Sequence, residues 1–265
     1  MLFNDPFDVQ RDFDFGFDIE ELKEPFVNEV LTLISSKEMP DLSSKPRIEY
    51  LIKRLRREDY DDIRKIILPE LPQLIAEGIQ NAQNSYDQIK NQWSEFIPDF
   101  RILCLSEIHD NILMWSHYSD SHKGAVLELQ SIDELDSPLL VSQPVTYQSF
   151  PSMWATKSEW AKIITGQQRL DLLSIFTKYA CTKNPEWAHE KEWRIVSFKR
   201  SGETGHFSDY PFHARELKSI YLGCDIPEED ANDIISLVKF DFSHVRIFRA
   251  NKIERNRKLS FDLIK

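Results

Sequence analysis

The segment AHEKEWRIV, residues 188–196, holds the residue types that acid–base chemistry requires. Alternate side chains of a β-strand share one face, and this spacing would place Glu190, Glu192 and Arg194 side by side. That face turns apolar at Val196, as expected of a strand that leaves a cleft and enters a core. A carboxylate held there by a neighbouring cation can act as a general base or stabilise a developing positive charge. The alternative interpretation is an ion pair between Glu192 and Arg194 on a solvated face.

A second group of candidate residues lies in LMWSHYSDSHKG, residues 113–124. If this segment is helical, His117 shares a face with Leu113, whereas Trp115 and Tyr118 share another. An imidazole can hydrogen-bond a nucleotide, and a phenol ring can stack on a base. The segment therefore indicates a nucleotide site, with a hydrogen-bonded histidine of the core as the alternative.

Several motifs that mark well-characterised chemistry are missing from the sequence. It contains no GxxxxGK[ST], GxGxxG, HExxH or GxSxG, so phosphate loops, dinucleotide-binding folds, zinc proteases and serine hydrolases lose their usual support. The seven histidines show no ligand spacing apart from the weak HE pair at 189–190. We therefore expect no metal.

The charge of the chain limits its partners. A formal net charge of −11 opposes wrapping around duplex nucleic acid or binding to an anionic membrane. The one dense basic run that stands out is KRLRR at 53–57, and acidic residues follow it directly. A self-paired helix face is the simpler interpretation of this run, and contact with nucleic acid is the alternative. We expect a small nucleotide or a protein as the partner, and no membrane.

Cysteine use and hydropathy favour a cytoplasmic protein. Three widely spaced cysteines without a CxxC pair suggest neither a disulfide framework nor a zinc ribbon. The first residues lack a basic lead followed by an apolar run, and no apolar run is long enough to cross a bilayer. We therefore expect a cytoplasmic location.

The candidate residues must be positioned by strands and short helices. Residues 17–95 are predicted to be helical, with an apolar stripe that places Pro72 in the first turn of a long helix. Short strands are predicted next, at 101–106, 125–129 and 144–147.

The remaining elements are predicted from residues that cap helices and from a proline that ends one. A short helix capped by Asp110 is expected between the first two strands, and a later helix is expected to end at Asn184-Pro185. The strands EWRIVSF and SIYLG then precede a helix from about 227–239, capped by Asp225, and the strand VRIFRA.

This order of elements predicts an α+β fold. The sheet is expected to be mixed and mostly antiparallel, with flanking helices and a helical segment near the N-terminus. We predict a single domain of residues 1–265, in which residues 17–95 form a mostly helical segment or insertion.

Six segments occur in an order that is informative: FNDPFD, CLSE, NILMWSHYSDSHKGAVLEL, VTY, EWAHEKEWRI and IYLGCDI. Together they resemble a widespread bacterial family catalogued as domain of unknown function 2971. The resemblance covers most of the chain outside residues 17–95, and LMWSHYSDSHKG with EKEWR is its most specific part. The family name carries no established activity.

The layout of this family is similar to that of the ADP-ribosyltransferases: an early polar-aromatic element, a central His-Tyr pair and a late strand-borne glutamate. In such enzymes the glutamate positions the nicotinamide ribose and stabilises an oxocarbenium-like centre. The resemblance implies Glu192 as the catalytic carboxylate, Glu190 as its neighbour and rival, and NAD as the cofactor. It also implies substrate- or cofactor-binding roles for Asn4, Asp5, Trp115, His117, Tyr118, Lys183 and Arg194.

We predict a nucleotide-dependent transferase or glycohydrolase of the ADP-ribosyl type. The alternative is a non-catalytic ligand- or protein-binding module in which the same residues form a structural network. Nucleic-acid processing in a defence or toxin setting is a third hypothesis, based on the KRLRR run and on how such families occur. For the first two hypotheses, one pocket is expected to be lined by Trp115, His117, Tyr118, Glu190 or Glu192, and Arg194.

Overall fold

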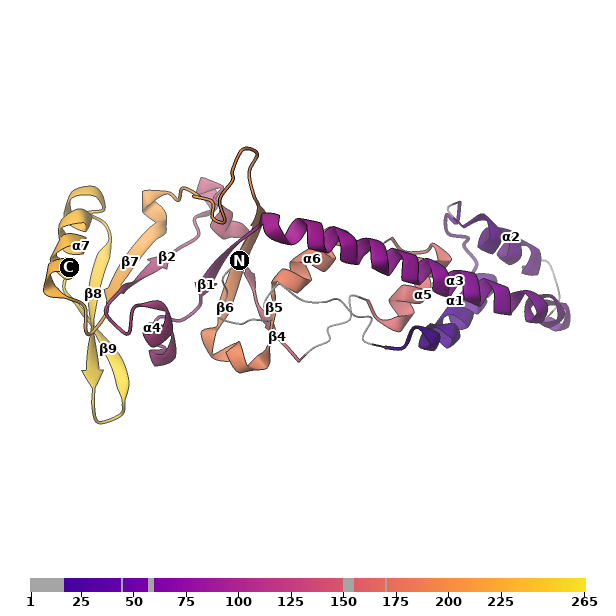
Figure 1. Cartoon of the computed structure of the whole chain (residues 1–265), viewed down its shortest axis with the longest axis horizontal. Coiled ribbons are helices and arrows are strands. Elements are labelled where there is room, and N and C mark those ends of the chain that lie inside the picture. Colours follow the sequence, from indigo (N-terminus) through magenta and orange to yellow (C-terminus); the bar gives the residue numbers. More distant parts are fainter. Residues whose placement is uncertain (1–16, 44, 57–59, 150–154, 170) are drawn as a thin grey trace. The chain divides into compact units, whose positions relative to one another are not determined.

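The computed structural model of the chain describes residues 17–43, 45–56, 60–149, 155–169 and 171–265 (Figure 1). The chain divides into two compact units, which are described here one after the other. The first unit comprises residues 1–99 and 149–180, and the second comprises residues 100–148 and 181–265. The single domain predicted from the sequence stays a prediction.

The first unit contains helices and no strand among its described residues. The predicted helical segment near the N-terminus is therefore confirmed. Within the part of the chain that the structure describes, no helix has the length and apolar character needed to span a membrane. The elements of the first unit are η1 (Ile19–Leu22), α1 (Lys23–Ser35), α2 (Pro46–Leu55), α3 (Tyr60–Phe96), η2 (Ile97–Asp99), α5 (Lys157–Thr165) and α6 (Leu172–Ala180).

The apolar stripe of the long helix α3 packs into the core of this unit. Residues of the stripe such as Ala82 and Trp93 are buried, and the Trp93 ring lies 5.1 Å from that of Phe176. The helix begins at Tyr60, so the prediction that Pro72 lies in its first turn is wrong. The helix contains both Pro69 and Pro72, although an interior proline removes a backbone donor and its ring crowds the preceding turn, which typically costs about 3 kcal/mol.

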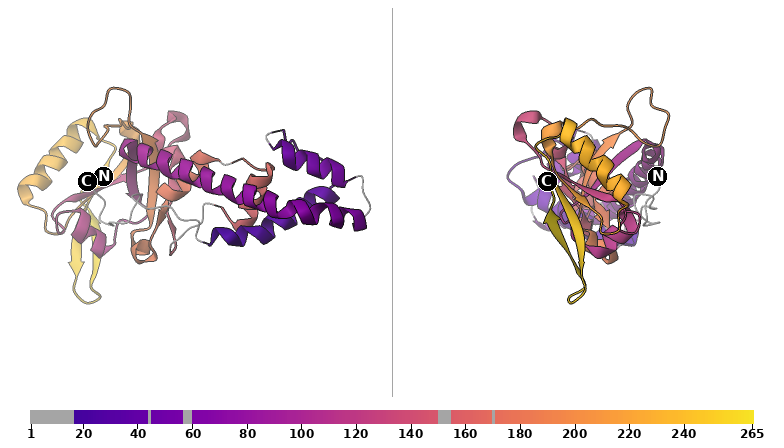
Figure 2. Two further views of the ribbon diagram at one scale, coloured as in Figure 1. Left: turned by 45° about the vertical axis from the view of Figure 1, so that its right-hand side comes forward. Right: turned by 90° about the vertical axis from the view of Figure 1, so that its left-hand side faces the viewer.

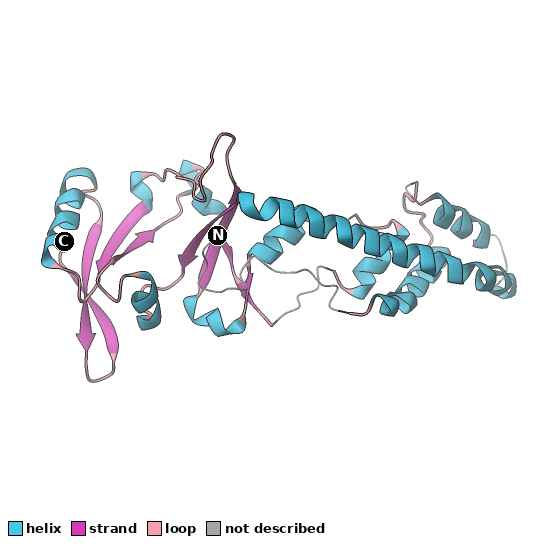
Figure 3. Ribbon diagram, viewed as in Figure 1, coloured by secondary structure: helices cyan, strands magenta, loops and turns pink. Residues whose placement is uncertain are grey.

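The second unit holds the strands. A three-stranded antiparallel sheet has the order β1-β6-β3, and a four-stranded sheet has the order β2-β7-β8-β9, in which β7 and β8 are parallel. The strands β4 and β5 form a short parallel pair. The predicted α+β fold with a mixed, mostly antiparallel sheet is thus confirmed (Figure 3). The strands are β1 (Phe100–Ser106), β2 (Ala125–Leu129), β3 (Gln143–Pro144), β4 (Thr146–Tyr147), β5 (Thr182–Lys183), β6 (Glu192–Phe198), β7 (Leu217–Leu222), β8 (Arg246–Ile253) and β9 (Lys258–Leu263).

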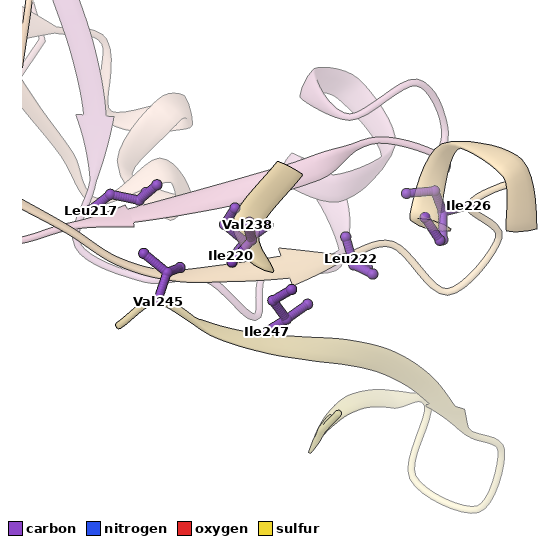
Figure 4. Packing of buried hydrophobic residues seen from close by; sticks show 8 residues of the cluster. Leu217, Ile220, Leu222, Ile226, Val238, Val245 and Ile247 are labelled. Atoms are coloured by element: carbon purple, nitrogen blue, oxygen red, sulfur yellow. The ribbon is translucent and has the colours of Figure 1, made fainter. Parts of the chain in front are cut away.

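Two α-helices and four short 3-10 helices connect these strands. The helix α7 packs on one face of the four-stranded sheet, where apolar side chains form a core (Figure 4). Ile220 of β7 pairs in register with Ile247 of β8, and Val238 of α7 belongs to the same core. The connecting elements are α4 (Ile112–Tyr118), η3 (Asp133–Leu135), η4 (Pro138–Val141), η5 (Pro185–Glu190), η6 (Ala214–Glu216) and α7 (Glu228–Asp241).

The helix α4 starts one residue later than the sequence suggested. Asn111 is its N-cap, and the side-chain oxygen of Asn111 accepts hydrogen bonds from the backbone N–H groups of Leu113 at 2.9 Å and Met114 at 3.3 Å. The predicted cap, Asp110, is therefore wrong. Asparagine and aspartate are about equally good caps, so the residue type alone could not distinguish the two positions.

Two further helix ends differ from the prediction. The helix α6 ends at Ala180 and not at Asn184, because the chain enters β5 before it reaches the proline. The helix α7 follows Pro227 without a side-chain cap. The carboxylate of Asp225, the predicted cap, instead forms an ion pair with Lys252, in which Oδ1 lies 2.7 Å from Nζ.

Two strand predictions also change. The segment 144–147 contributes to both β3 and β4, which pair with different partners. The final strand β9 was not predicted, although its residues alternate between apolar and polar types. The strands at 101–106 and 125–129 agree with the structure to within one residue.

A strained turn joins α4 to β2. Asp120, Ser121 and His122 have positive φ values of 46°, 54° and 69°, in the left-handed region that costs non-glycine residues about 1–3 kcal/mol each. The carbonyl oxygen of His122 accepts a hydrogen bond of 3.1 Å from the N–H of Asp225. A Cβ atom at Gly223 would lie 2.0 Å from that same oxygen. The turn therefore fits against the end of β7 only because residue 223 has no side chain.

Replacing Gly223 by alanine should destabilise the protein. The new methyl group would meet backbone atoms that cannot rotate away, and overpacking of this kind typically costs about 1–3 kcal/mol. Gly205→Ala is the matched control, because its Cβ would meet nothing closer than 3.7 Å. Urea denaturation should show a lower free energy of unfolding for Gly223→Ala alone. Equal stability of the two variants would contradict the close approach.

Candidate charged site

Four charged side chains are buried together in the second unit, and we call them the charged cluster: Lys183, Glu190, Glu192 and Arg194. Their exposed fractions are 4%, 3%, 5% and 0%, respectively. Two cations and two carboxylates make the cluster formally neutral. Burying charges is tolerated only when they are paired and hydrogen-bonded, so the geometry of the pairing decides what this site can do.

Three neighbouring segments position the charged cluster. Lys183 is the last residue of β5, and Glu190 is the last residue of η5. Glu192 and Arg194 are the first and third residues of β6, so they share one face of that strand. Lys191 has a φ of 48° and turns the chain between the 3-10 helix and the strand.

The strand predicted from Glu190 onward therefore begins two residues later. Glu190 does not belong to the same strand face as Glu192, because the left-handed residue Lys191 separates them. Lys183 nevertheless bridges the two carboxylates. Its Nζ lies 2.6 Å from Oε2 of Glu190 and 3.1 Å from Oε2 of Glu192.

Arg194 holds Glu192 with two parallel hydrogen bonds. Its Nε donates to Oε1 of Glu192 at 2.8 Å, and its Nη2 donates to Oε2 at 3.0 Å. Bidentate pairs between a guanidinium and a carboxylate are among the strongest charge-assisted contacts in proteins. Both oxygens of Glu192 are thus engaged by cations.

Two tyrosines form further hydrogen bonds with residues of the charged cluster. The hydroxyl of Tyr118 donates to Oε1 of Glu190 at 2.6 Å, and the backbone N–H of Glu192 donates to the hydroxyl of Tyr147 at 2.7 Å. Tyr118 comes from α4 and is 53% exposed, so it links the buried carboxylate to the surface. The Nζ of Lys183 also lies 4.8 Å from the centroid of the Trp187 ring, within range of a cation–π contact.

These contacts favour the ionised forms of the Glu192 carboxylate and the Lys183 ammonium group at neutral pH. Burial alone would raise the pKa of Glu192, but the hydrogen bonds and charge of Arg194, with help from Cys104 and Lys183, hold this pKa below its usual value. Burial alone would lower the pKa of Lys183, but the two glutamates raise this pKa above its usual value. Burial also raises the pKa of Tyr147, with the neighbouring carboxylates adding to the shift.

The structure brings five of the predicted site residues together: Tyr118, Lys183, Glu190, Glu192 and Arg194. Trp115 is buried elsewhere on α4, where its indole N–H donates to the carbonyl of His109 at 2.6 Å and its ring packs near Phe261. His117 is exposed and forms no hydrogen bond with any described residue. Asn4 and Asp5 lie outside the described residues. One pocket shared by all of these residues stays a prediction.

Further residues that were not singled out from the sequence contact the charged cluster, among them Tyr147, Cys104 and Trp187. Tyr147 belongs to the VTY segment, and only its position in β4 beside β5 reveals its role. Cys104 faces Arg194 across the β1-β6 pair. These contacts depend on strand pairing, which the local sequence does not specify.

Other parts of the described structure provide weaker candidates for a functional site. Among the described residues, no group of three or more His, Cys, Asp or Glu side chains could hold a metal ion. A cavity within the first unit is lined by residues that include Lys45, Arg47, Leu74 and Glu77. None of the predicted site residues lines that cavity, and its charged pair, Arg47 and Glu77, is exposed.

Removing Lys183 alone should be more damaging than removing it together with Glu190. Lys183→Met leaves one buried carboxylate without its cation, which typically costs about 3–5 kcal/mol. Lys183→Met/Glu190→Gln leaves the neutral Glu192–Arg194 pair, so the double variant should recover part of this loss. Lys218→Met, which breaks the partly exposed pair with Glu128, is the control and should cost less than about 1 kcal/mol. A double variant whose loss in urea denaturation equals or exceeds that of Lys183→Met would contradict the neutrality argument.

The charged cluster should also limit the pH range of stability. The lowered pKa of Glu192 contributes stability that is present above its ordinary value of 4.5 and is lost as the pH falls through the folded-state value. The raised pKa of Lys183 contributes stability that is present below its ordinary value of 10.5 and is lost as the pH rises further. The difference in melting temperature between wild type and Lys183→Met should therefore be largest between these limits and shrink outside them. A difference that stays constant from pH 3 to pH 11.5 would refute this assignment.

The match to known proteins covers this site. Residues 114–195 match the model of a family described as a protein of unknown function (DUF2971). The match begins inside α4 and ends one residue after Arg194, so it contains the whole charged cluster and both tyrosines. No curated protein and no solved structure matches the chain. The family predicted from the sequence motifs is confirmed by this match over residues 114–195.

Proposed function

We propose that the chain is a non-catalytic binding module in which the charged cluster is a structural network. The observation that carries this proposal is that cations engage both oxygens of the buried Glu192 carboxylate. Arg194 occupies both of its carboxylate oxygens, and Lys183 occupies one of them a second time. A general base needs a lone pair within hydrogen-bond reach of the proton it removes. A substrate would have to compete with these charge-assisted hydrogen bonds for a carboxylate that is only 5% exposed.

The second carboxylate supports the same conclusion. Oε1 of Glu190 accepts from Tyr118, and Oε2 accepts from Lys183. A buried ionic network adds little net stability, but it fixes geometry because each member must meet its partners. Here the network ties β5, η5 and β6 to α4 and β4, which gives α4 a rigid base.

The exposed side of α4 is the proposed binding surface. Ile112 and Leu113 are 41% and 52% exposed, and the exposed His117 follows Leu113 by one helical turn, whereas Tyr118, 53% exposed, lies on the neighbouring face. Apolar and aromatic side chains gathered on one exposed helix are typical of contacts with another protein. The hydrogen bond from Tyr118 to Glu190 would hold this surface in a fixed position, so a protein partner is the favoured occupant.

The ADP-ribosyl-type transferase or glycohydrolase remains the second candidate. It is favoured by one observation, the half-exposed Tyr118 ring whose hydroxyl reaches a buried carboxylate. In this alternative, Tyr118 and His117 would hold the nucleotide. The ionised Glu192 would stabilise positive charge on the ribose of NAD as the bond to nicotinamide breaks.

Thermal melting with and without NAD distinguishes the two candidates. A ligand that binds only the folded state stabilises it by about 2.7 kcal/mol at a hundredfold excess over Kd. For the binding module we expect no shift with millimolar NAD, and a clear loss of stability in Glu192→Gln, because Arg194 and Lys183 lose the charge of a partner. The transferase requires the opposite results: a rise with NAD that His117→Ala abolishes, and an unchanged or raised melting temperature for Glu192→Gln.

A further inference from the structure

The hairpin formed by β8 and β9 concentrates positive charge in an acidic protein. Between Arg246 and Lys258 there are six basic residues and one acidic residue, in a chain of net charge −11. Apart from the adjacent Arg257 and Lys258, the basic residues are separated by one or two others, so the sequence shows no run as dense as KRLRR. Strand pairing brings them together on one hairpin.

The outer part of this hairpin is a two-stranded ribbon. The strand β7 pairs with β8 only as far as Arg249, whereas β9 pairs with β8 on to Ile253. Beyond Arg249, therefore, β8 has β9 as its only described strand partner. Residues 251–258 are all exposed, and Figure 2 shows the hairpin (yellow) extending away from the other strands of its sheet. We call residues 250–261 the basic ribbon.

Several charges of the basic ribbon are not neutralised. Lys252 pairs with Asp225, but Arg255, Arg257 and Lys258 form no ion pair with any described residue. The single acidic residue of the turn is Glu254. The turn and the first residue of β9 thus present three cations and one carboxylate to solvent, and this local field opposes the negative charge of the whole chain.

We propose that the basic ribbon docks on duplex DNA through its phosphate backbone. The major groove of B-DNA is about 12 Å wide and admits a two-stranded β-ribbon. Arginine forms bidentate contacts with phosphate, and the exposed amide of Asn256 can donate further hydrogen bonds. An acidic protein segment fits less well, because residues 251–258 contain no aromatic anchor of the kind that protein interfaces use.

This inference goes beyond the proposed function. The basic ribbon and the exposed side of α4 are separate surfaces of the second unit, and the ribbon does not depend on the role of the charged cluster. It also corrects an expectation about charge, since KRLRR at 53–57 is not the one basic concentration in the chain.

Fluorescence anisotropy with a labelled 20-base-pair DNA duplex tests the proposal on the full chain. Each phosphate contact contributes about 0.9 to the slope of log affinity against log salt, so binding should weaken steeply between 50 and 200 mM salt. Arg255→Gln/Arg257→Gln should weaken binding at 50 mM salt and lower this slope by about 2. Lys37→Gln/Lys239→Gln removes the same charge from exposed lysines outside the ribbon and should leave the slope unchanged.

Competitors separate the possible anions. Duplex RNA of the same length should bind more weakly, because the major groove of A-form RNA is too narrow and deep for side chains to read. A polyglutamate peptide of equal charge should compete poorly. The proposal is overturned by an absence of DNA binding at 50 mM salt, by equal losses in the two double variants, or by equally tight binding of RNA or polyglutamate. Unchanged melting temperatures of both variants will confirm that neither has unfolded.

Discussion

The second unit depends on one constraint, the neutrality of four buried charges. Moving a single carboxylate or ammonium group out of water costs several kcal/mol, and only matched partners offset this. Lys183, Glu190 and the Glu192–Arg194 pair come from three different elements, so these elements must reach one another for any of the charges to be tolerated. The charged cluster therefore acts more as a condition on the fold than as a source of stability.

The same constraint distinguishes a catalytic site from a binding surface. Chemistry on a substrate needs a group whose hydrogen-bonding capacity is partly unused, whereas a binding surface needs a rigid support beneath it. The bonds to Arg194, Lys183 and Tyr118 engage all four oxygens of the two buried carboxylates, and the bond from Tyr118 connects α4 to the charged cluster. The geometry of the charged cluster thus favours support over catalysis, and the nucleotide hypothesis relies on the exposed tyrosine alone.

Local patterns in the sequence predicted where most helices and strands lie, but not which of them come into contact. The strand at 125–129 follows from alternating side chains after a glycine, and the long helix follows from its apolar stripe. Glu190 was assigned to a strand because nothing local reveals the left-handed backbone of Lys191. Lys183 could be named as a partner only through a family resemblance, since its contacts depend on the pairing of β4 and β5. The charges of the β8–β9 hairpin escaped a search for contiguous runs because folding, and not sequence adjacency, gathers them.

The position of β9 has a consequence for how copies of the protein behave toward one another. It forms one edge of the four-stranded sheet, where backbone donors and acceptors on the outer side face no described strand. Such edges can template the addition of a strand from another molecule, and charged side chains oppose this. Lys258 begins β9, Asp262 lies near its end, and the arginines of the turn precede it. Parallel edge-to-edge pairing of two copies would bring Lys258 and the arginines of the turn close to their counterparts, so these like charges oppose that mode of aggregation.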